Sequence, residues 1–350
     1  MARILTTIAL LAISTLAAFF GGKVGLPLPF LLGPLIVTAV IAVARPRPMP
    51  RDYAFPQWIR LIFITVIGVM IGAQVTPDLF ADAPLLLISF AALGVFVLLA
   101  HGWNYAVFRH LGGYDRVTAF FASAPGGLYE SIALGEEAGA DLPRLMLQQF
   151  LRIIVVVSAL PIGLSLWLGT PVGSAAGLSL AARTVPWADL PVIVLTGIAG
   201  YGIGRVLRMP AAQLTGPMAA AAAVSLSGLA PMGVPQWMVN EAQIVLGTAL
   251  GMRFVGISPA MILRGAWMSV LSVGGMLVLA GIGALALRPV IGQDFDVLLI
   301  SFAPGGVTEM ALVALSLSAN PAFVTLHHIF RILITVVALG LSAKWLRRRA

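Results

Sequence analysis

Ala124-Pro125-Gly126-Gly127-Leu128-Tyr129-Glu130 returns 179 positions later as Ala303-Pro304-Gly305-Gly306-Val307-Thr308-Glu309, and both copies lie in strongly apolar sequence. Proline and paired glycines break a helix, and a carboxylate follows three residues after the second glycine. In lipid, broken backbone and a buried charge both need partners. The repetition of so unfavourable a phrase at matching positions predicts a binding site at the breaks.

The composition predicts an all-α polytopic membrane protein. Of the 350 residues, 60% are hydrophobic and 10% are charged, and the mean hydropathy is +1.02, far above that of a soluble domain. The sequence contains no cysteine, which excludes disulfides, thiol nucleophiles and thiolate metal sites. We therefore expect no metal site and no cofactor, and a lipid bilayer as the main partner.

The net charge of +8 does not indicate nucleic-acid binding. The 21 lysine and arginine residues lie in short loops, at helix ends and in a C-terminal cluster at 344–349, rather than on one soluble face. We expect no direct contact with nucleic acid and interpret these charges as topology signals.

The repetition extends over the whole chain and predicts two homologous membrane repeats. From Pro56 onward the copies align at an offset of 179, so that Arg152 matches Arg331. The apolar N-terminus resembles a signal peptide, but it aligns with 188–206 at an offset of 183 and is expected to remain as the first helix. The first repeat, the linker and the second repeat fall at 1–170, 171–186 and 187–350.

Each repeat contains six apolar segments. In the first repeat they run near 4–20, 28–44, 57–76, 84–108, 117–139 and 143–170, and in the second near 187–206, 211–230, 237–256, 258–287, 294–318 and 321–343. The fifth segment contains the Pro-Gly-Gly break. If it spans the membrane, each repeat has six helices and the repeats are parallel; if it is re-entrant, each has about five and the repeats are inverted. A spanning but discontinuous fifth helix is a third possibility.

The distribution of basic residues favours inverted repeats with both termini in the cytoplasm. On the cytoplasmic side this arrangement places the C-terminal cluster together with Arg45, Arg47, Arg51, Arg109, Arg116, Arg144, Arg205, Arg208 and Arg253. It leaves outside only Lys23, Arg183 and Arg288. The parallel arrangement instead leaves outside Arg144, Arg205, Arg208 and Arg253.

A half-helix begins after each break, and its free amide groups and dipole favour an anion. Glu130 and Glu309 lie in the first turn of these half-helices. Two interpretations are open: each carboxylate caps the exposed amides, or it binds a proton or cation that is coupled to transport. The break residues are expected to contact the substrate: Pro125, Gly126, Gly127, Pro304, Gly305 and Gly306.

Arg152 and Arg331 lie eight to ten residues into the last helix of each repeat, too deep to anchor a loop. A buried guanidinium needs an anion. Gln148 and His327 precede the arginines by one turn, so each helix presents a polar face, and we expect all four side chains to bind substrate. The alternative is an ion pair between each arginine and the glutamate of its own repeat.

The repeats differ at one polar pair, which is Gln148-Gln149 in the first and His327-His328 in the second. Neighbouring helical residues diverge by about 100°, so the two histidines do not chelate one metal. A histidine here either handles protons or is hydrogen-bonded in a polar core. Glu241 and Gln243, which have apolar counterparts in the first repeat, either add a ligand or line a helix contact.

Three stretches of the sequence resemble the bacterial AbrB membrane-protein family. They are Gly-Leu-Pro-Leu-Pro-Phe-Leu-Leu-Gly-Pro at 25–34, Ser123–Gly127 with Glu130, and Ala303–Glu309 with the later His327-His328-x-x-Arg331. The resemblance covers essentially the whole chain, and this family is distinct from the small soluble DNA-binding regulator of the same name. It implies a multi-pass protein of the bacterial inner membrane.

The labels attached to that family are ammonia monooxygenase and AbrB-type regulator of gene expression. An ammonia monooxygenase needs a metal centre, and four histidines without cysteine offer poor ligands, so we expect no enzyme activity. Regulation through this chain would be indirect, because no DNA-reading module is present in the sequence.

We hypothesise an ion-coupled secondary transporter of a small, anionic metabolite that binds near the midplane between the two breaks. Glu130 and Glu309 would carry the coupling ion. A homo-oligomer is possible. The alternative is a membrane-embedded sensor that binds a metabolite and regulates gene expression without transport.

Overall fold

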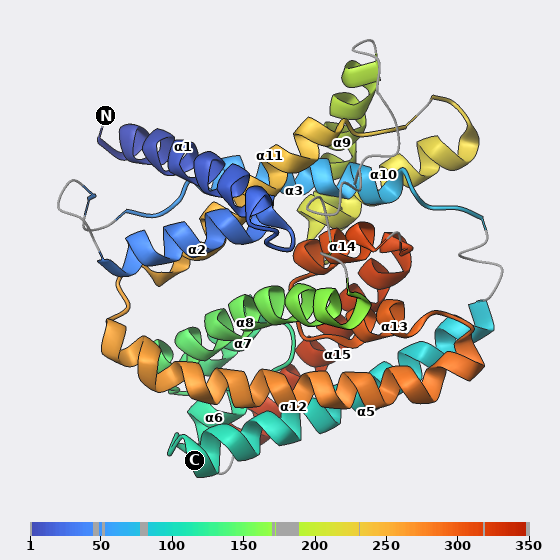
Figure 1. The fold of residues 1–350 in the computed structure, drawn as a ribbon. Helices are drawn as coiled ribbons and strands as arrows, with labels where there is room; N and C mark the ends of the chain where they lie inside the picture. Colours follow the sequence, from blue (N-terminus) through green and yellow to red (C-terminus); the bar gives the residue numbers. More distant parts are fainter. Residues whose placement is uncertain are drawn as a thin grey trace. The chain divides into compact units, whose positions relative to one another are not determined.

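The computed structural model describes residues 2–44, 49–50, 53–77, 83–169, 172, 189–230, 232–317 and 319–347, with side chains up to 342 except that of Ala83. Every regular element in these residues is a helix, which confirms the all-α part of the predicted fold (Figure 1). Most of the predicted linker lies outside the described residues, as do the topology residues Arg45, Arg47, Arg51, Arg183, Arg348 and Arg349.

Five of the described helices are long and apolar enough to cross a membrane. They are α1 (Ala2–Lys23), α5 (Ala83–Ala106) continued by the π-helical turn η1 (Val107–Leu111), α8 (Leu142–Leu168), α12 (Pro259–Ile291) and α15 (Pro321–Arg347). About twenty helical residues span a hydrocarbon core of about 30 Å. The chain is therefore a multi-pass membrane protein.

The remaining described helices are shorter. They are α2 (Pro29–Ala44), α3 (Gln57–Gly72), α6 (Arg116–Ala122), α7 (Leu128–Glu137), α9 (Leu190–Val206), α10 (Ala212–Ser227), α11 (Gln236–Gly251), the 3-10 turn η4 (Met252–Phe254), α13 (Phe295–Phe302) and α14 (Val307–Ser316). Each predicted apolar segment begins with a helix whose first residue lies within a few residues of the predicted start. In both halves the fifth segment is divided into two short helices.

The chain forms two compact units, and each unit draws on both halves of the sequence. The first unit comprises Met1–Leu79, Leu160–Ile257 and Ala311–Ala322, and the second comprises Phe80–Ala159, Ser258–Met310 and Phe323–Ala350. All residues of the predicted substrate and coupling sites belong to the second unit.

Close helix packing defines the first unit, where α3 runs along α10 and α2 runs along α11 (Figure 1). Glycines permit the approach. A Cβ atom on Gly68 would lie 2.5 Å from the carbonyl oxygen of Leu214, and one on Gly251 would lie 2.6 Å from that of Leu35. Small residues are the usual means by which helix backbones come into contact in membranes.

In the second unit, the long helix α12 packs against α5 and α13 (Figure 1). The buried Asn104 on α5 donates to the carbonyl of Ser123 at 3.1 Å and accepts from the hydroxyl of Ser272 at 2.6 Å. Because Ser123 ends α6, this contact holds the short helix between two long ones and positions the first break.

Candidate functional site

The backbone leaves the helical conformation at both Pro-Gly-Gly sequences. α6 ends before the first and α7 begins after it, and α13 and α14 flank the second in the same way. Gly127 has φ of 62°, in the left-handed region that glycine adopts without steric cost. The longest of these four helices has ten residues, so none of them crosses the hydrocarbon core alone.

The first break lies against α15. A Cβ atom on Gly126 would stand 3.3 Å from the hydroxyl of Thr335 and 3.7 Å from Nε of Arg331, and one on Gly127 would stand 3.0 Å from Val336. The first break and the arginine of the second half therefore share one location within the second unit.

Each buried arginine binds the broken backbone of its own half. Arg152 on α8 donates through Nη1 to the carbonyl of Ala124, and Arg331 on α15 donates through Nη1 to that of Ala303 and through Nη2 to that of Gly305 at 2.5 Å. Carbonyls at a helix C-terminus lack intrahelical partners and form the negative end of the dipole. The guanidinium groups thus bond carbonyls at and just beyond the C-terminal ends of α6 and α13.

Neither arginine forms an ion pair with a carboxylate in the described part of the chain, so the alternative pairing with Glu130 or Glu309 does not occur there. Both Nε atoms are buried and have no hydrogen-bond partner in the described residues. The two charges lie close enough for Arg152 to repel Arg331. Two buried like charges without a counter-ion favour binding of an anion.

The glutamates turn back toward the breaks. The carboxylate of Glu309 occupies the space in which a side chain on Gly306 would stand, and an oxygen of Glu130 lies 3.4 Å from the corresponding point on Gly127. Glu130 is exposed and Glu309 is half-buried. Neither carboxylate forms a hydrogen bond within the described residues, so the capping interaction does not form there.

Gln149, rather than Gln148, contacts the first break. Its Nε2 donates to the carbonyls of Phe121 at 3.1 Å and Ala122 at 3.2 Å, and Ser131 donates to Phe121 at 2.5 Å. These donors satisfy further carbonyls at the end of α6. The sequence prediction chose Gln148 because it lies one turn before Arg152.

Gln148 belongs to a separate polar cluster. Its Nε2 donates to the hydroxyl of Tyr114 at 2.9 Å, and its Oε1 accepts from Ser269 on α12 at 2.6 Å. Burial raises the pKa of the Tyr114 phenol, which keeps the hydroxyl neutral. This cluster ties α8 to α12.

His327 has a partner at both ring nitrogens. Nδ1 lies 2.8 Å from the carbonyl of Phe323, and Nε2 lies 2.6 Å from the hydroxyl of Ser89 on α5. A carbonyl only accepts, so Nδ1 carries the hydrogen and the neutral ring accepts from Ser89. Of the two interpretations, the geometry matches a histidine that is hydrogen-bonded in a polar core.

His328 bonds the C-terminal part of α13, as Gln149 bonds that of α6. Its Nε2 lies 3.0 Å from the carbonyl of Ile300 and is therefore the protonated nitrogen. Nδ1 is buried and has no hydrogen-bond partner within the described part of the chain. The adjacent histidines thus hold opposite tautomers and point to different elements. Among the described residues no three histidine, aspartate or glutamate side chains gather into a metal site.

Several polar residues of this site were not predicted, namely Ser89, Asn104, Ser131, Ser269, Ser272 and Thr335. Serine and threonine are common in membrane helices, so their identity alone carries little signal. Gln243, in the first unit, is fully buried with both amide atoms unpaired, whereas Glu241 is exposed.

Comparisons with known proteins place this arrangement in a family. The model of the family described as "Transition state regulatory protein AbrB" matches residues 30–347. A Bacillus subtilis (strain 168) protein, YhjN, is 25% identical over 355 residues, covering 94% of this chain and 90% of its own. The Escherichia coli (strain K12) protein named "Putative regulator AbrB" is 26% identical over 330 residues, covering 91% and 90%. Since the family model covers most of this helical, apolar chain, the chain belongs to the membrane AbrB family, not to the small soluble proteins of that name.

Proposed function

We propose that this chain is an ion-coupled secondary transporter of a small anion, built from two inverted repeats. The observation that carries the proposal is the pair of buried guanidinium groups, one on each closing helix, that have no carboxylate partner in the described residues. The transported molecule is expected to leave chemically unchanged.

Equivalent contacts support the duplication. The approach of Gly68 to Leu214 on α10 is matched, at the offsets found in the sequence, by that of Gly247 to Leu31 on α2. The bond from Arg152 to Ala124 is likewise matched by that from Arg331 to Ala303. A pair of repeats related by two-fold symmetry makes each contact twice in this way.

The anion would bind beside Arg331, where hydrogen-bond donors from both halves of the chain lie close together. Arg331 adjoins both breaks, because it bonds Gly305 of the second and lies beside Gly126 of the first. The first turns of α7 and α14 add free amide groups and the positive ends of helix dipoles. An anion at this place would offset the repulsion between the two arginines, which favours anionic over neutral substrates.

Glu130 and Glu309 would carry the coupling ion. Each stands in the first turn of a half-helix, close to the break and free of internal hydrogen bonds in the described residues. Protonation or cation binding at these carboxylates would cancel a negative charge beside the anion site. Loading of the ion and of the anion would therefore favour one another.

Uptake into proteoliposomes tests the proposal. The purified chain is reconstituted, and uptake of radiolabelled dicarboxylates, phosphate and sulfate is measured with and without an imposed proton or sodium gradient. Arg331→Lys keeps the charge but loses the planar fork, so uptake at low substrate should fall roughly tenfold or more. Glu130→Gln and Glu309→Gln should abolish the gradient dependence.

Glu136→Gln is the matched control, because Glu136 lies on α7 but at its exposed C-terminal end. Anion binding without flux in any gradient would contradict transport. Equal flux in the parent and in the Arg331→Lys variant would contradict the assigned anion site.

A membrane-embedded metabolite sensor is the second candidate, and the regulator name of the Escherichia coli relative favours it. A sensor would bind the anion through the same arginines but show no flux. Deleting the gene and measuring transcript changes with and without a transport-dead variant separates the two functions. Regulation that survives loss of flux would support sensing.

The inverted topology and the cytoplasmic location of both termini are part of the proposal. Single cysteines introduced at Arg205 and Arg208 should be labelled only from the cytoplasmic side of inner-membrane vesicles. The chain has no native cysteine, so the labelling background is low. Labelling of these positions from the periplasm would overturn the inverted arrangement.

A further inference from the structure

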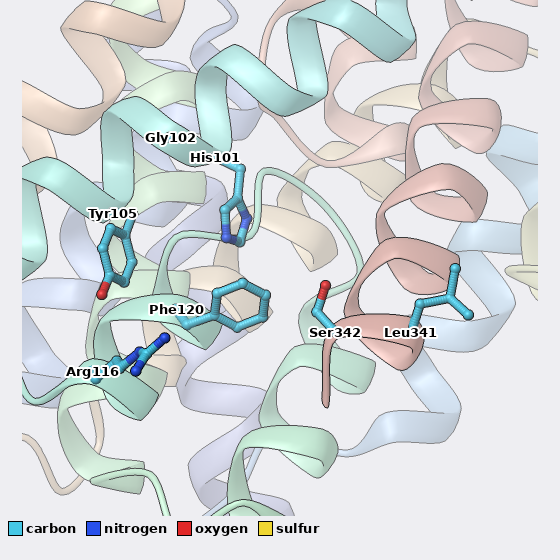
Figure 2. A pocket seen from close by; sticks show the side chains of 7 residues that line it. All are labelled: His101, Gly102, Tyr105, Arg116, Phe120, Leu341 and Ser342. Carbon is cyan, nitrogen blue, oxygen red and sulfur yellow. The ribbon is translucent and has the colours of Figure 1, made fainter. Parts of the chain in front are cut away.

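The second unit contains a pocket of about 530 Å³ that the proposed transport site does not use (Figure 2). Its walls are His101, Gly102 and Tyr105 from α5, Arg116 and Phe120 from α6, and Leu341 and Ser342 from α15. This volume lies within the range of pockets that hold small amphiphilic ligands.

The pocket joins an apolar wall to a small set of polar groups. Most of its surface is apolar, and the ring of Phe120 packs edge-on against His101 with centroids 4.7 Å apart. Nε2 of His101 is buried and has no hydrogen-bond partner among the described residues. In Figure 2, Tyr105 and Arg116 lie on one side of the Phe120 ring and Ser342 lies on the other.

The charge of the lining is positive. Arg116 is a cation, and among the residues that the structure describes no carboxylate lines the pocket. Tyr105 stands one turn after His101 on the same face of α5, so a hydroxyl and an imidazole accompany the guanidinium. A guanidinium with neighbouring neutral donors suits a phosphate anion.

The pocket lies at the ends of two membrane spans. Tyr105 is near the end of the span Pro84–Leu111, and Ser342 lies in the last part of α15, which ends at Arg347. The basic cluster at 344–349 follows directly in the sequence. Tyrosine and clustered basic residues at the end of a span mark the headgroup level of the bilayer and attract anionic lipids.

We propose that this pocket binds an anionic phospholipid. The phosphate of the lipid is held by Arg116, the Tyr105 hydroxyl and Nε2 of His101, and its apolar part packs against Phe120. The chemistry recognised is a phosphate carried on an apolar body, and the occupant is a lipid rather than a free phosphate ester. This inference does not depend on transport.

Lipid binding is measured by native mass spectrometry of the full-length protein released from detergent micelles. Dioleoyl phosphatidylglycerol is titrated in parallel with dioleoyl phosphatidylcholine and with glycerol phosphate. Phosphatidylglycerol should bind at least tenfold more tightly than phosphatidylcholine, and glycerol phosphate should not bind measurably.

Gly102→Leu is the decisive variant, because it fills the pocket without removing a charge. A Cβ atom on Gly102 meets no atom within 4 Å, and leucine favours a helix over glycine, so folding should be preserved. Its affinity for phosphatidylglycerol should fall at least tenfold. Gly274→Leu is the control, since Gly274 on α12 also faces open space but does not line the pocket.

Arg116→Gln tests the contribution of the positive charge to lipid binding. Arg144→Gln is the control, because it removes an exposed cation from the same unit. Arg116→Gln should weaken binding about five- to tenfold and Arg144→Gln should not. Unchanged phosphatidylglycerol binding in Gly102→Leu, or equal binding of both lipids, would overturn the proposal. Glycerol phosphate binding that Gly102→Leu abolishes would assign the pocket to a free phosphate ester instead.

Discussion

Replacing Arg331 with leucine should destabilise the protein more than replacing Arg152 with leucine, because the two arginines satisfy different numbers of carbonyls. Arg331 bonds the carbonyls of Ala303 and Gly305, whereas Arg152 bonds that of Ala124 alone. Ala303 also accepts from the amide of Gly305 at 2.9 Å and Ala124 from Gln149 at 3.5 Å, so among the described residues the carbonyl of Gly305 is the one that loses its donor. A buried carbonyl left without a donor costs about 1–3 kcal/mol. Both variants also remove one buried charge and relieve the same mutual repulsion, so these contributions cancel in the comparison. The difference between the variants should therefore be about 1–3 kcal/mol.

The free energy of unfolding is measured in detergent micelles by titration with sodium dodecyl sulfate, followed by circular dichroism. The double variant adds a second test. Each single substitution removes the repulsion between the arginines, but the double substitution removes it only once. Its destabilisation should therefore exceed the sum of the single effects, by roughly 0.5–3 kcal/mol. An Arg152→Leu protein as unstable as Arg331→Leu would refute the assignment of two carbonyls to Arg331.

Three further predictions test the packing and the helix ends by the same unfolding measurement. Gly251→Ala should destabilise the protein by about 1–3 kcal/mol because the added methyl group meets the Leu35 carbonyl. Gly274→Ala, with no neighbour in the way, should gain up to about 1 kcal/mol from helix propensity. Equal effects of the two substitutions would contradict the close packing at Gly251. The free energy of unfolding of His328→Gln should stay within about 1 kcal/mol of the parent, since a glutamine donates at the matching place in the first half. His328→Leu, which removes the donor, should cost about 1–3 kcal/mol. Similar losses in the two variants would argue against a donor role for His328. Asp115 caps α6 by accepting hydrogen bonds from Thr118 and Val117. Burial raises the pKa of its carboxyl, but these hydrogen bonds outweigh burial and leave the pKa below 3.8. Asp115→Ala should therefore cost about 0.5–2 kcal/mol at pH 7. This stabilisation is present above the pKa of the unfolded state and is lost as the pH falls through the pKa of the folded state. The difference in the free energy of unfolding between parent and variant should therefore disappear below about pH 3.8. An unchanged difference at pH 3 would contradict the capping role.

The fold was predictable to the extent that it depends on apolar length and on helix breakers. Pro125 and the glycines beside it mark the interruption between α6 and α7, and Pro304 marks that between α13 and α14. These are local effects of proline and glycine on the backbone, so they can be read from a single sequence. The division into two compact units could not be predicted, because each unit combines distant stretches of both halves.

The site was only partly predictable. The burial of Arg152 and Arg331 followed from their depth in apolar helices, but their carbonyl partners did not. A guanidinium bonds a carboxylate or a carbonyl equally well in geometry, and only the fold decides which one is within reach. The choice of Gln148 over Gln149 illustrates a second limit, because residues three and four positions before an arginine both lie on its side of the helix.

The hydrogen bond between His327 and Ser89 has a directional consequence. At present the serine hydroxyl gives its hydrogen to Nε2, while Nδ1 gives its own to Phe323. A proton that arrived at Nε2 would turn the ring into a donor at both ends, and the serine would have to accept and aim its hydrogen elsewhere. Protonation of His327 on α15 would thus rotate the Ser89 hydroxyl on α5, with no movement of either backbone.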